Sequence, residues 1–178
     1  PGIFGQDEVR FDNGITLLGG LRVDHHEEHG VITSPRVAFK WDAREHTQVR
    51  INAGTGFRVV NLFTEDHAAL TGARDVVITS ELEPERSHSL TLNVNQVVQF
   101  GPNPMMIDLD VFYTRFSNKI VPDYDADPNQ IVYGNLSGYA ISRGVGVTLN
   151  QNVAFDRFLY SVGVTLQDVF TVDDGDSE

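Results

Sequence analysis

Cysteine is absent from this 178-residue sequence, and the absence excludes a disulfide scaffold and a zinc site built on thiolates. It fits a reducing compartment as well as a protein that crosses an oxidising one without bridges. No apolar run approaches the roughly 18 residues that a membrane-spanning helix needs. The sequence begins at Pro1 without the charged and then apolar region of a signal peptide. We therefore expect a soluble protein, a processed product or a piece of a larger protein.

Positive charge is scarce as well. The 13 lysines and arginines face 25 aspartates and glutamates, which gives a formal net charge of −12. This charge repels phosphate-rich partners, so we expect no nucleic acid partner. Hydrophobic residues make up 40% of the chain, which is enough for one domain with a core. We expect residues 1–178 to form a single segment.

Apolar and polar residues alternate along most of the chain. In residues 35–42, for example, Val37, Phe39 and Trp41 alternate with polar neighbours. Such a period of two is typical of a strand with one apolar face. The same alternation marks residues 2–11, 15–25, 35–42, 48–57, 87–96, 106–116, 139–150 and 157–166. The sequence predicts an all-β fold, an antiparallel meander of about eight long strands, and no helix.

The links between these strands alternate in length. Short, turn-like links at 12–14, 43–46, 101–104 and 151–156 alternate with long links at 25–33, 58–86 and 117–137, and an acidic tail follows from Thr171. Long two-faced strands with short turns at one end and long loops at the other are what an outer-membrane barrel requires. The residues expected to face lipid are Leu17, Leu21, Val23, Val37, Phe39, Trp41, Val49 and Ile51. A soluble β-sandwich binding module, directed for instance at carbohydrate, is the alternative that alternation alone leaves open.

Three stretches carry a family resemblance. They are "GLRVDHHEEHGVITSPRVAFKWDA" (20–43), "RINAGTGFRVVNLFTE" (50–65) and "ELEPERSHSLTLNVN" (81–95). In this order and spacing they resemble the middle of the barrel in TonB-dependent outer-membrane receptors, and the resemblance covers roughly residues 2–166. The positions that match the family pattern are Pro35 with Arg36, Gly54, Gly56, Phe57 and Arg58, the segment Asn61 to Glu65, and Leu82, Pro84 and Glu85.

The resemblance implies a function. The chain is expected to be a fragment of a larger transmembrane β-barrel of about twenty-two strands, whose plug domain and remaining strands it lacks. It would belong to a TonB-dependent active transporter in the outer membrane of a Gram-negative bacterium. The transporter would take up a scarce nutrient such as a ferric siderophore, cobalamin or a glycan. Its partners would be outer-membrane lipid, the plug domain, TonB and the nutrient ligand, and we expect no enzyme activity and no cofactor. The end "DDGDSE" departs from the family, which usually ends on an aromatic residue.

The stretch "GTGFRVVNLFTED" (54–66) looks like a phosphate loop, but Val59 stands where a dinucleotide fingerprint needs its third glycine. We interpret Gly54 and Gly56 as packing glycines on the lumen-facing side of a strand. Arg58 shares that side, and we favour a structural ion pair for it over contact with a ligand.

Two clusters resemble metal sites. "HHEEH" (25–29) contains H-x-x-E-H, but that zinc-protease motif requires a helix, and here a strand leads in. We expect a solvated loop tip. Opportunistic metal contact by His25, His26 or His29 is the second hypothesis, and a metal-dependent hydrolase is a distant third. "DYDADP" (123–128) places Asp123, Asp125 and Asp127 like the first EF-hand ligands but lacks the later ones. The candidate substrate-binding residues on the long-loop side are His25, His26, His29, Arg58 and Glu65; we predict no catalytic residue and no resident metal.

Overall fold

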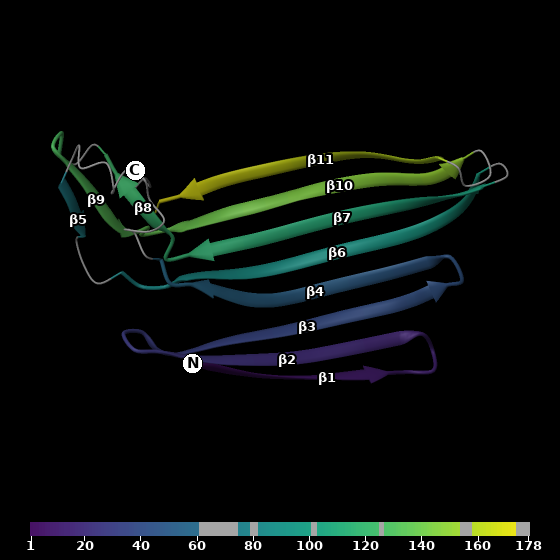
Figure 1. Ribbon diagram of the computed structural model, residues 1–178, viewed down its shortest axis with the longest axis horizontal. Coiled ribbons are helices and arrows are strands. Elements are labelled where there is room, and N and C mark those ends of the chain that lie inside the picture. The colour runs from purple at the N-terminus through teal and green to yellow at the C-terminus, as the bar shows by residue number, and fades with distance from the viewer. Residues whose placement is uncertain (61–74, 79–81, 101–102, 125–126, 154–157, 174–178) are drawn as a thin grey trace.

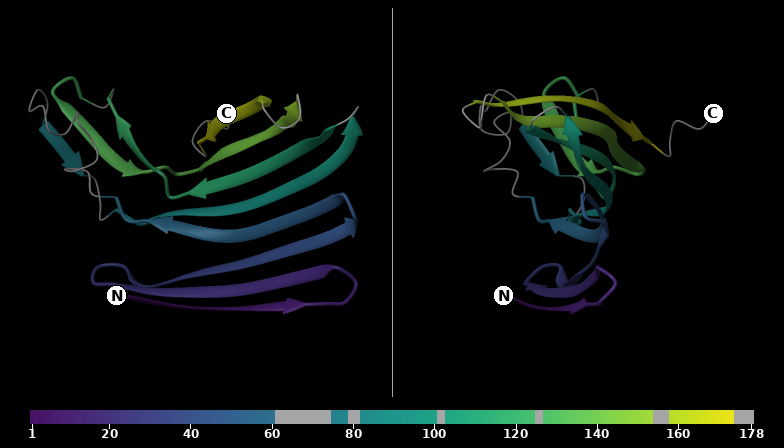
Figure 2. Two further views of the ribbon diagram at one scale, coloured as in Figure 1. Left: turned by 45° about the vertical axis from the view of Figure 1, so that its right-hand side comes forward. Right: turned by 90° about the vertical axis from the view of Figure 1, so that its right-hand side faces the viewer.

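A computed structural model describes residues 1–60, 75–78, 82–100, 103–124, 127–153 and 158–173 of the protein. Eight antiparallel strands form one large sheet, in the order β1-β2-β3-β4-β6-β7-β10-β11. They are β1 (Gly2–Arg10), β2 (Ile15–His26), β3 (Gly30–Arg44), β4 (Thr47–Arg58), β6 (Glu85–Phe100), β7 (Asn103–Ser117), β10 (Tyr139–Val153) and β11 (Phe158–Val172). The sheet is curved and twisted, and its edges β1 and β11 do not meet (Figures 1 and 2). The predicted meander of eight long strands is confirmed.

Cross-strand register sorts the side chains onto two faces. Trp41, Val49, Val94, Leu109, Val147 and Val164 are successive partners across six strands. One residue away, Asp42, Gln48, Asn95, Asp108 and Thr148 form a parallel row on the opposite face. Because directly paired residues point to the same side of a sheet, the apolar row lies on one face and the polar row on the other. We call them the outer face and the inner face.

The apolar band drifts along the outer face. Leu21 on β2 pairs with Pro35 on β3, whereas the row of partners Thr55, His88 and Arg115 on β4, β6 and β7 is polar. On β11 the apolar run Val162, Val164 and Leu166 is accordingly closer to the short turns. A row of register partners runs at right angles to the strands. When strands are tilted by about 35–45° to the membrane normal, such a row is not level with the membrane, so the lipid-facing band must shift along the strands from one strand to the next.

The short links gather at one end of the large sheet, as predicted (Figure 1). Two of the four expected links, 101–104 and 151–156, fall partly outside the described residues, but the strand ends that flank them pair at this same end. Gly14 has a φ of 79° and closes the β1–β2 turn, in which the Asn13 side chain accepts a hydrogen bond from the Ile15 amide (3.3 Å).

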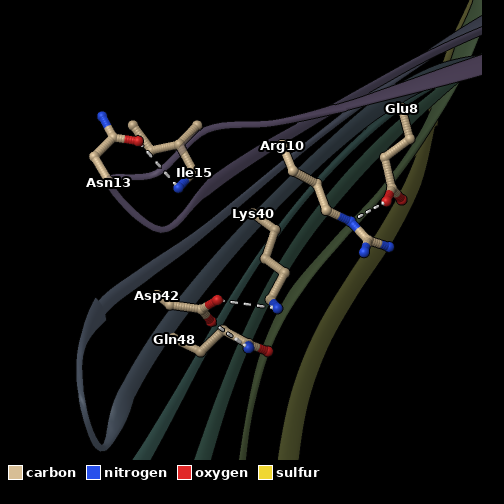
Figure 3. Close-up of polar contacts among 7 residues, drawn as sticks. All are labelled: Glu8, Arg10, Asn13, Ile15, Lys40, Asp42 and Gln48. Atoms are coloured by element: carbon tan, nitrogen blue, oxygen red, sulfur yellow. Dashed lines mark hydrogen bonds and ion pairs between the residues drawn. The ribbon is translucent and has the colours of Figure 1, made fainter.

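Polar side chains tie the inner face together close to these turns (Figure 3). Arg10 Nε lies 2.7 Å from Glu8 Oε1, and Lys40 Nζ lies 3.1 Å from Asp42 Oδ2. Gln48 donates a hydrogen bond to Asp42 Oδ1 (2.7 Å). The inner face therefore pairs its charges within and between neighbouring strands.

The long links differ from the prediction in two ways. The link expected at 25–33 is a tight hairpin, because β2 continues to His26 and β3 begins at Gly30. The links 58–86 and 117–137 contain three short strands, β5 (Asp75–Ile78), β8 (Ile120–Asp123) and β9 (Gln130–Asn135). They form a second sheet in the order β5-β9-β8, with β5 parallel to β9, beyond the long-loop end of the large sheet (Figure 1). We call it the rim sheet.

The rim sheet contains a small hydrophobic core, although Ile32 of β3 and Ala140 and Ile141 of β10 are buried as well. Ile131 and Tyr133 of β9 are only 4% and 1% exposed, and they pack against Val60, Val76, Leu82 and Ile120. On the large sheet, by contrast, apolar side chains such as Leu21 (50%) and Val164 (65%) remain exposed. No helix among the described residues is long and apolar enough to cross a membrane.

Candidate functional site

The end of β4 and the start of β6 bring opposite charges together on the inner face at the long-loop end. Arg58 is the register partner of Glu85, and Arg58 Nε lies 2.9 Å from Glu85 Oε2. The second carboxylate oxygen of Glu85 accepts a hydrogen bond from the backbone amide of Ile120 at the start of β8 (3.0 Å). Glu85 therefore links the large sheet to the rim sheet through both of its oxygens.

A group of hydrogen bonds extends this link. The Asn135 side-chain amide donates to the carbonyls of Glu83 (3.0 Å) and Asn118 (2.7 Å), and its oxygen accepts from the Glu83 amide (2.8 Å). Asn118 in turn donates to the Glu83 carboxylate (2.7 Å). Asn118 has a φ of 55°, a conformation that asparagine tolerates better than most residues. We call Glu83, Glu85, Asn118 and Asn135 the rim clasp.

The rim clasp explains the "ELEPE" stretch. Pro84 is buried between its two glutamates, and both carboxylates are engaged. Sequence reasoning singled out Pro84 and Glu85 but missed Asn118 and Asn135. Their signal was weak, because a single asparagine in a long link has no period and no neighbouring motif.

Beside the ion pair, the inner face is hollowed to about 430 Å³. Gly56, Arg58, Ser87, Phe116, Lys119 and Val169 are among its lining residues. A Cβ atom on Gly56 would lie 3.0 Å from Ser87 Oγ, so glycine at this position leaves room in the hollow. A surface with an ion pair, an ammonium group and an aromatic ring can hold a polar ligand or a protein loop by charge and by contact. None of the three candidate histidines lines this hollow.

Arg36 spans a neighbouring strand on the same face. Its side chain crosses Gly20 of β2 and donates a hydrogen bond to the Gln6 side chain on β1. A Cβ atom on Gly20 would lie 3.0 Å from Arg36 Nε, whereas one on Gly54 would meet Arg36 Cβ at an ordinary 3.4 Å. Steric packing therefore favours glycine at position 20 more strongly than at position 54, and Gly20 was missed by the sequence analysis.

On the outer face, basic and aromatic side chains follow the apolar band on its long-loop side. The Arg115 guanidinium lies 4.3 Å from the centre of the Tyr139 ring, and that of Arg143 lies 5.3 Å from the Phe170 ring. Arg143 also pairs with Asp168 (2.9 Å). Residues with an apolar body and a polar tip are typical of the level at which a membrane meets water.

The histidine-rich tip does not form the motif that its sequence suggested. The structure brings His26, Glu28 and His29 together, with their ligand atoms within 4.8 Å of one another. His25 lies outside this group because neighbouring residues of β2 point to opposite faces. The expected site residue Glu65 lies outside the described residues, as does Asp125 of the calcium-like stretch. Asp127 accepts a hydrogen bond from the Asn129 amide (2.8 Å) within a local turn.

Comparison with known proteins identifies relatives of this two-faced sheet. A family model described as "TonB dependent receptor-like, beta-barrel" matches residues 1–178. Over 119 residues the chain is 29% identical to an iron-regulated outer membrane virulence protein of Vibrio cholerae, a match that covers 66% of this chain and 18% of that protein. The chain thus spans about a fifth of the length of the curated relatives that it matches.

Solved structures show the same fold. The siderophore receptor PirA from Pseudomonas aeruginosa matches with a TM-score of 0.76 and 19% sequence identity, over 96% of this chain and 34% of that one. The FrpB iron transporter from Neisseria meningitidis (F3-3 variant) matches with a TM-score of 0.73 and 16% identity, over 97% of this chain and 26% of that one.

Proposed function

The chain belongs to the family of TonB-dependent receptor-like β-barrels, and from this premise we propose that it forms the middle of the barrel wall in an outer-membrane transporter that takes up a ferric chelate. Members of this family are transporters and receptors of the outer membrane. We propose that residues 1–178 are one segment of such a protein, with a plug domain and further strands elsewhere in the parent chain.

The two-faced large sheet is the observation that carries this proposal. Its outer face exposes apolar side chains along a tilted band, and its inner face pairs polar groups. Lipid on one side and a wet lumen on the other satisfy both faces at once. The unpaired edges β1 and β11 call for further strands, because an exposed edge is a template for pairing.

The iron-related cargo is supported by the relatives. The Vibrio protein is named for iron regulation, and PirA is named a siderophore receptor. The negative charge of the long-loop side further restricts the class of cargo. Acidic residues such as Glu27, Glu28 and Glu83 lie on the long-loop side, and they repel a strongly anionic cargo. We propose a ferric chelate with a small or positive net charge, with cobalamin and glycans as the other classes.

Capture and release would occur at different places. Cargo would first meet the long-loop end, where His25, His26, His29, Arg58 and Glu65 are the proposed contacts. The plug would lie against the inner face, where basic side chains such as Arg36 would be partners for acidic groups of the plug. TonB would then supply the energy for release through the plug. The work is binding and gating, with no bond made or broken.

A soluble β-sandwich is not favoured. A sandwich buries the apolar face of one sheet under a second sheet of comparable size. In the part of the chain that the structure describes, the only other sheet has three short strands and stands beyond the end of the large one.

The test is uptake by cells that carry the full-length receptor. A strain lacking the receptor gene is complemented with the intact gene, and accumulation of radioactive iron is measured with ferric chelates of negative, neutral and positive charge, in the presence and absence of TonB. We expect TonB-dependent uptake of neutral or cationic chelates and recovery of the receptor in the outer-membrane fraction. A receptor recovered in the soluble periplasm, or iron uptake unchanged by the deletion with every chelate, would contradict the proposal.

A further inference from the structure

The hairpin between β2 and β3 stands at the long-loop end of the sheet and contains three histidines in five residues (Figure 1). β2 ends at His26 and β3 begins at Gly30, and these two residues are register partners. Gly30 has a φ of 66°, a conformation that glycine adopts without strain. The turn therefore folds residues 27–29 back over the end of β2, which brings His29 close to His26.

The fold assembles a set of metal ligands at this tip. The ligand atoms of His26, Glu28 and His29 lie within 4.8 Å of one another. The two imidazole rings are stacked, with centroids 4.8 Å apart and an angle of 23° between their planes. Donor atoms that share a zinc or copper ion lie on the order of 3 to 3.5 Å apart, given bonds of about 2.0 to 2.1 Å. The longest of these separations must therefore shorten by roughly 1.3 to 1.8 Å, and the two rings must rotate out of their stacked arrangement so that both nitrogen lone pairs point at the ion. The turn is exposed and its glutamate is flexible, so such a rearrangement is local.

Little competes with a metal ion for these groups. His26 Nδ1 accepts only a long hydrogen bond from the Glu28 amide (3.3 Å), which a metal would displace. No lysine or arginine occurs between Arg22 and Arg36 in the sequence. Arg22 itself donates two hydrogen bonds to Asp24 (2.7 and 2.8 Å), so its charge is already paired. Together with Glu27 and Glu28, this makes the tip locally anionic and favourable to a cation.

We propose that His26, Glu28 and His29 form a surface site for an exchangeable divalent transition-metal ion, with water completing its coordination. Two imidazoles and one carboxylate suit Cu²⁺ and Zn²⁺, and Cu²⁺ binds more tightly because it stands highest in the Irving–Williams order. The site uses His26 in place of His25, so it differs from the H-x-x-E-H pattern read along the sequence. The site shares His26 and His29 with the proposed cargo contacts, but its ligand is the metal ion alone, so it does not require uptake of a ferric chelate.

The test is a Cu²⁺ titration of the detergent-solubilised full-length receptor, followed by electron paramagnetic resonance. We expect His26→Ala and His29→Ala each to weaken binding at least tenfold and to reduce the number of histidine nitrogens coupled to copper from two to one. Glu28→Gln should weaken binding by a few fold. His25→Ala is the matched control and should leave the titration unchanged. Zn²⁺ should displace the copper only in large excess.

Two results would overturn the proposal. One is a wild-type titration that superimposes on that of the His26→Ala, His29→Ala double variant, since metal would then bind elsewhere or not at all. The other is an equal loss in His25→Ala, since binding would then follow histidine content and not this geometry. Because the readout is metal binding by the purified receptor, the result stands whether or not the receptor transports a ferric chelate.

Discussion

The large sheet and the rim sheet are built from similar residues for different surroundings. The large sheet places valine, leucine and phenylalanine on an outer face that remains exposed, so those residues need lipid. The rim sheet turns Ile131 and Tyr133 inwards and buries them almost completely. The difference teaches that alternation of apolar residues reports a two-faced strand but not the medium that covers its apolar face.

The two sheets also differ in what connects their strands. Every pair of neighbours in the large sheet is antiparallel, whereas β5 and β9 of the rim sheet are parallel and lie more than fifty residues apart in sequence. The rim sheet therefore depends on side-chain packing and on the rim clasp to hold distant segments together. This contrast can be tested by removing the contacts on which each sheet depends.

The largest expected effect is in the core of the rim sheet. Tyr133→Ala removes a side chain that is 1% exposed, and loss of a buried aromatic residue costs about 3–5 kcal/mol. We expect faster hydrogen exchange of the amides of β8 and β9 in the full-length receptor, by about a hundredfold or more, with β2 to β4 unaffected. Tyr113→Ala, on the exposed outer face, is the matched control. Equal exchange in both variants would mean that the rim sheet has no core of its own.

The next effect is on the outer face of the large sheet. Leu21→Arg places a charge in the lipid-facing band, which should cost roughly 2–4 kcal/mol at mid-membrane depth. Leu18→Arg is the control, because Leu18 lies on the inner face opposite Glu8 and Ala38. Denaturant unfolding of the receptor in lipid vesicles measures both. If Leu18→Arg is the more harmful change, the two faces have been assigned the wrong way round.

The two sheets also show how far sequence reasoning reaches. In β3 and β6 the alternation runs through most of strands of 15 and 16 residues, so periodicity identified them and their faces. The rim strands have four to six residues, and a run such as "VVI" is too short to distinguish a strand from an apolar link. The hairpin at 25–33 was missed for another reason. The pairing of β2 with β3 continues through polar residues beyond the end of the apolar band.

The candidate site was predictable only where a motif marked it. Arg58 and Glu85 come from recognisable stretches, and their register makes them neighbours. Asn118 and Asn135 come from links that carry no pattern, and only the folded rim clasp reveals that they face Glu83. His26 was one of three equivalent histidines in the sequence, and the alternation of side chains along β2 decided that His26 and not His25 joins Glu28 and His29.

A smaller effect is expected where a glycine of the large sheet supports an aromatic ring. A Cβ atom on Gly144 would lie 2.6 Å from Phe112 Cζ and 2.5 Å from the Leu166 carbonyl oxygen. Gly144→Ala should therefore destabilise the receptor by about 1–3 kcal/mol, as overpacking does. A Cβ atom on Gly19 would meet nothing within 4 Å, so Gly19→Ala is the control. Equal midpoints of unfolding for the two variants would show that β10 and β11 shift freely to make room.

The smallest effect concerns the ion pair where the two sheets meet. The Arg58 side chain is 60% exposed, so its pairing with Glu85 should contribute only about 0.2–1 kcal/mol and weaken as salt is added. A double-mutant cycle with Arg58→Met and Glu85→Gln, measured by denaturant unfolding at low and high salt, isolates this contribution. Glu85→Ala should cost more than Glu85→Gln, because it also removes the acceptor of the Ile120 amide hydrogen bond. A coupling energy above about 2 kcal/mol that salt does not change would mean that the plug or another part of the receptor covers the ion pair. The hollow beside the pair would then be a protein interface and not a place where cargo first binds.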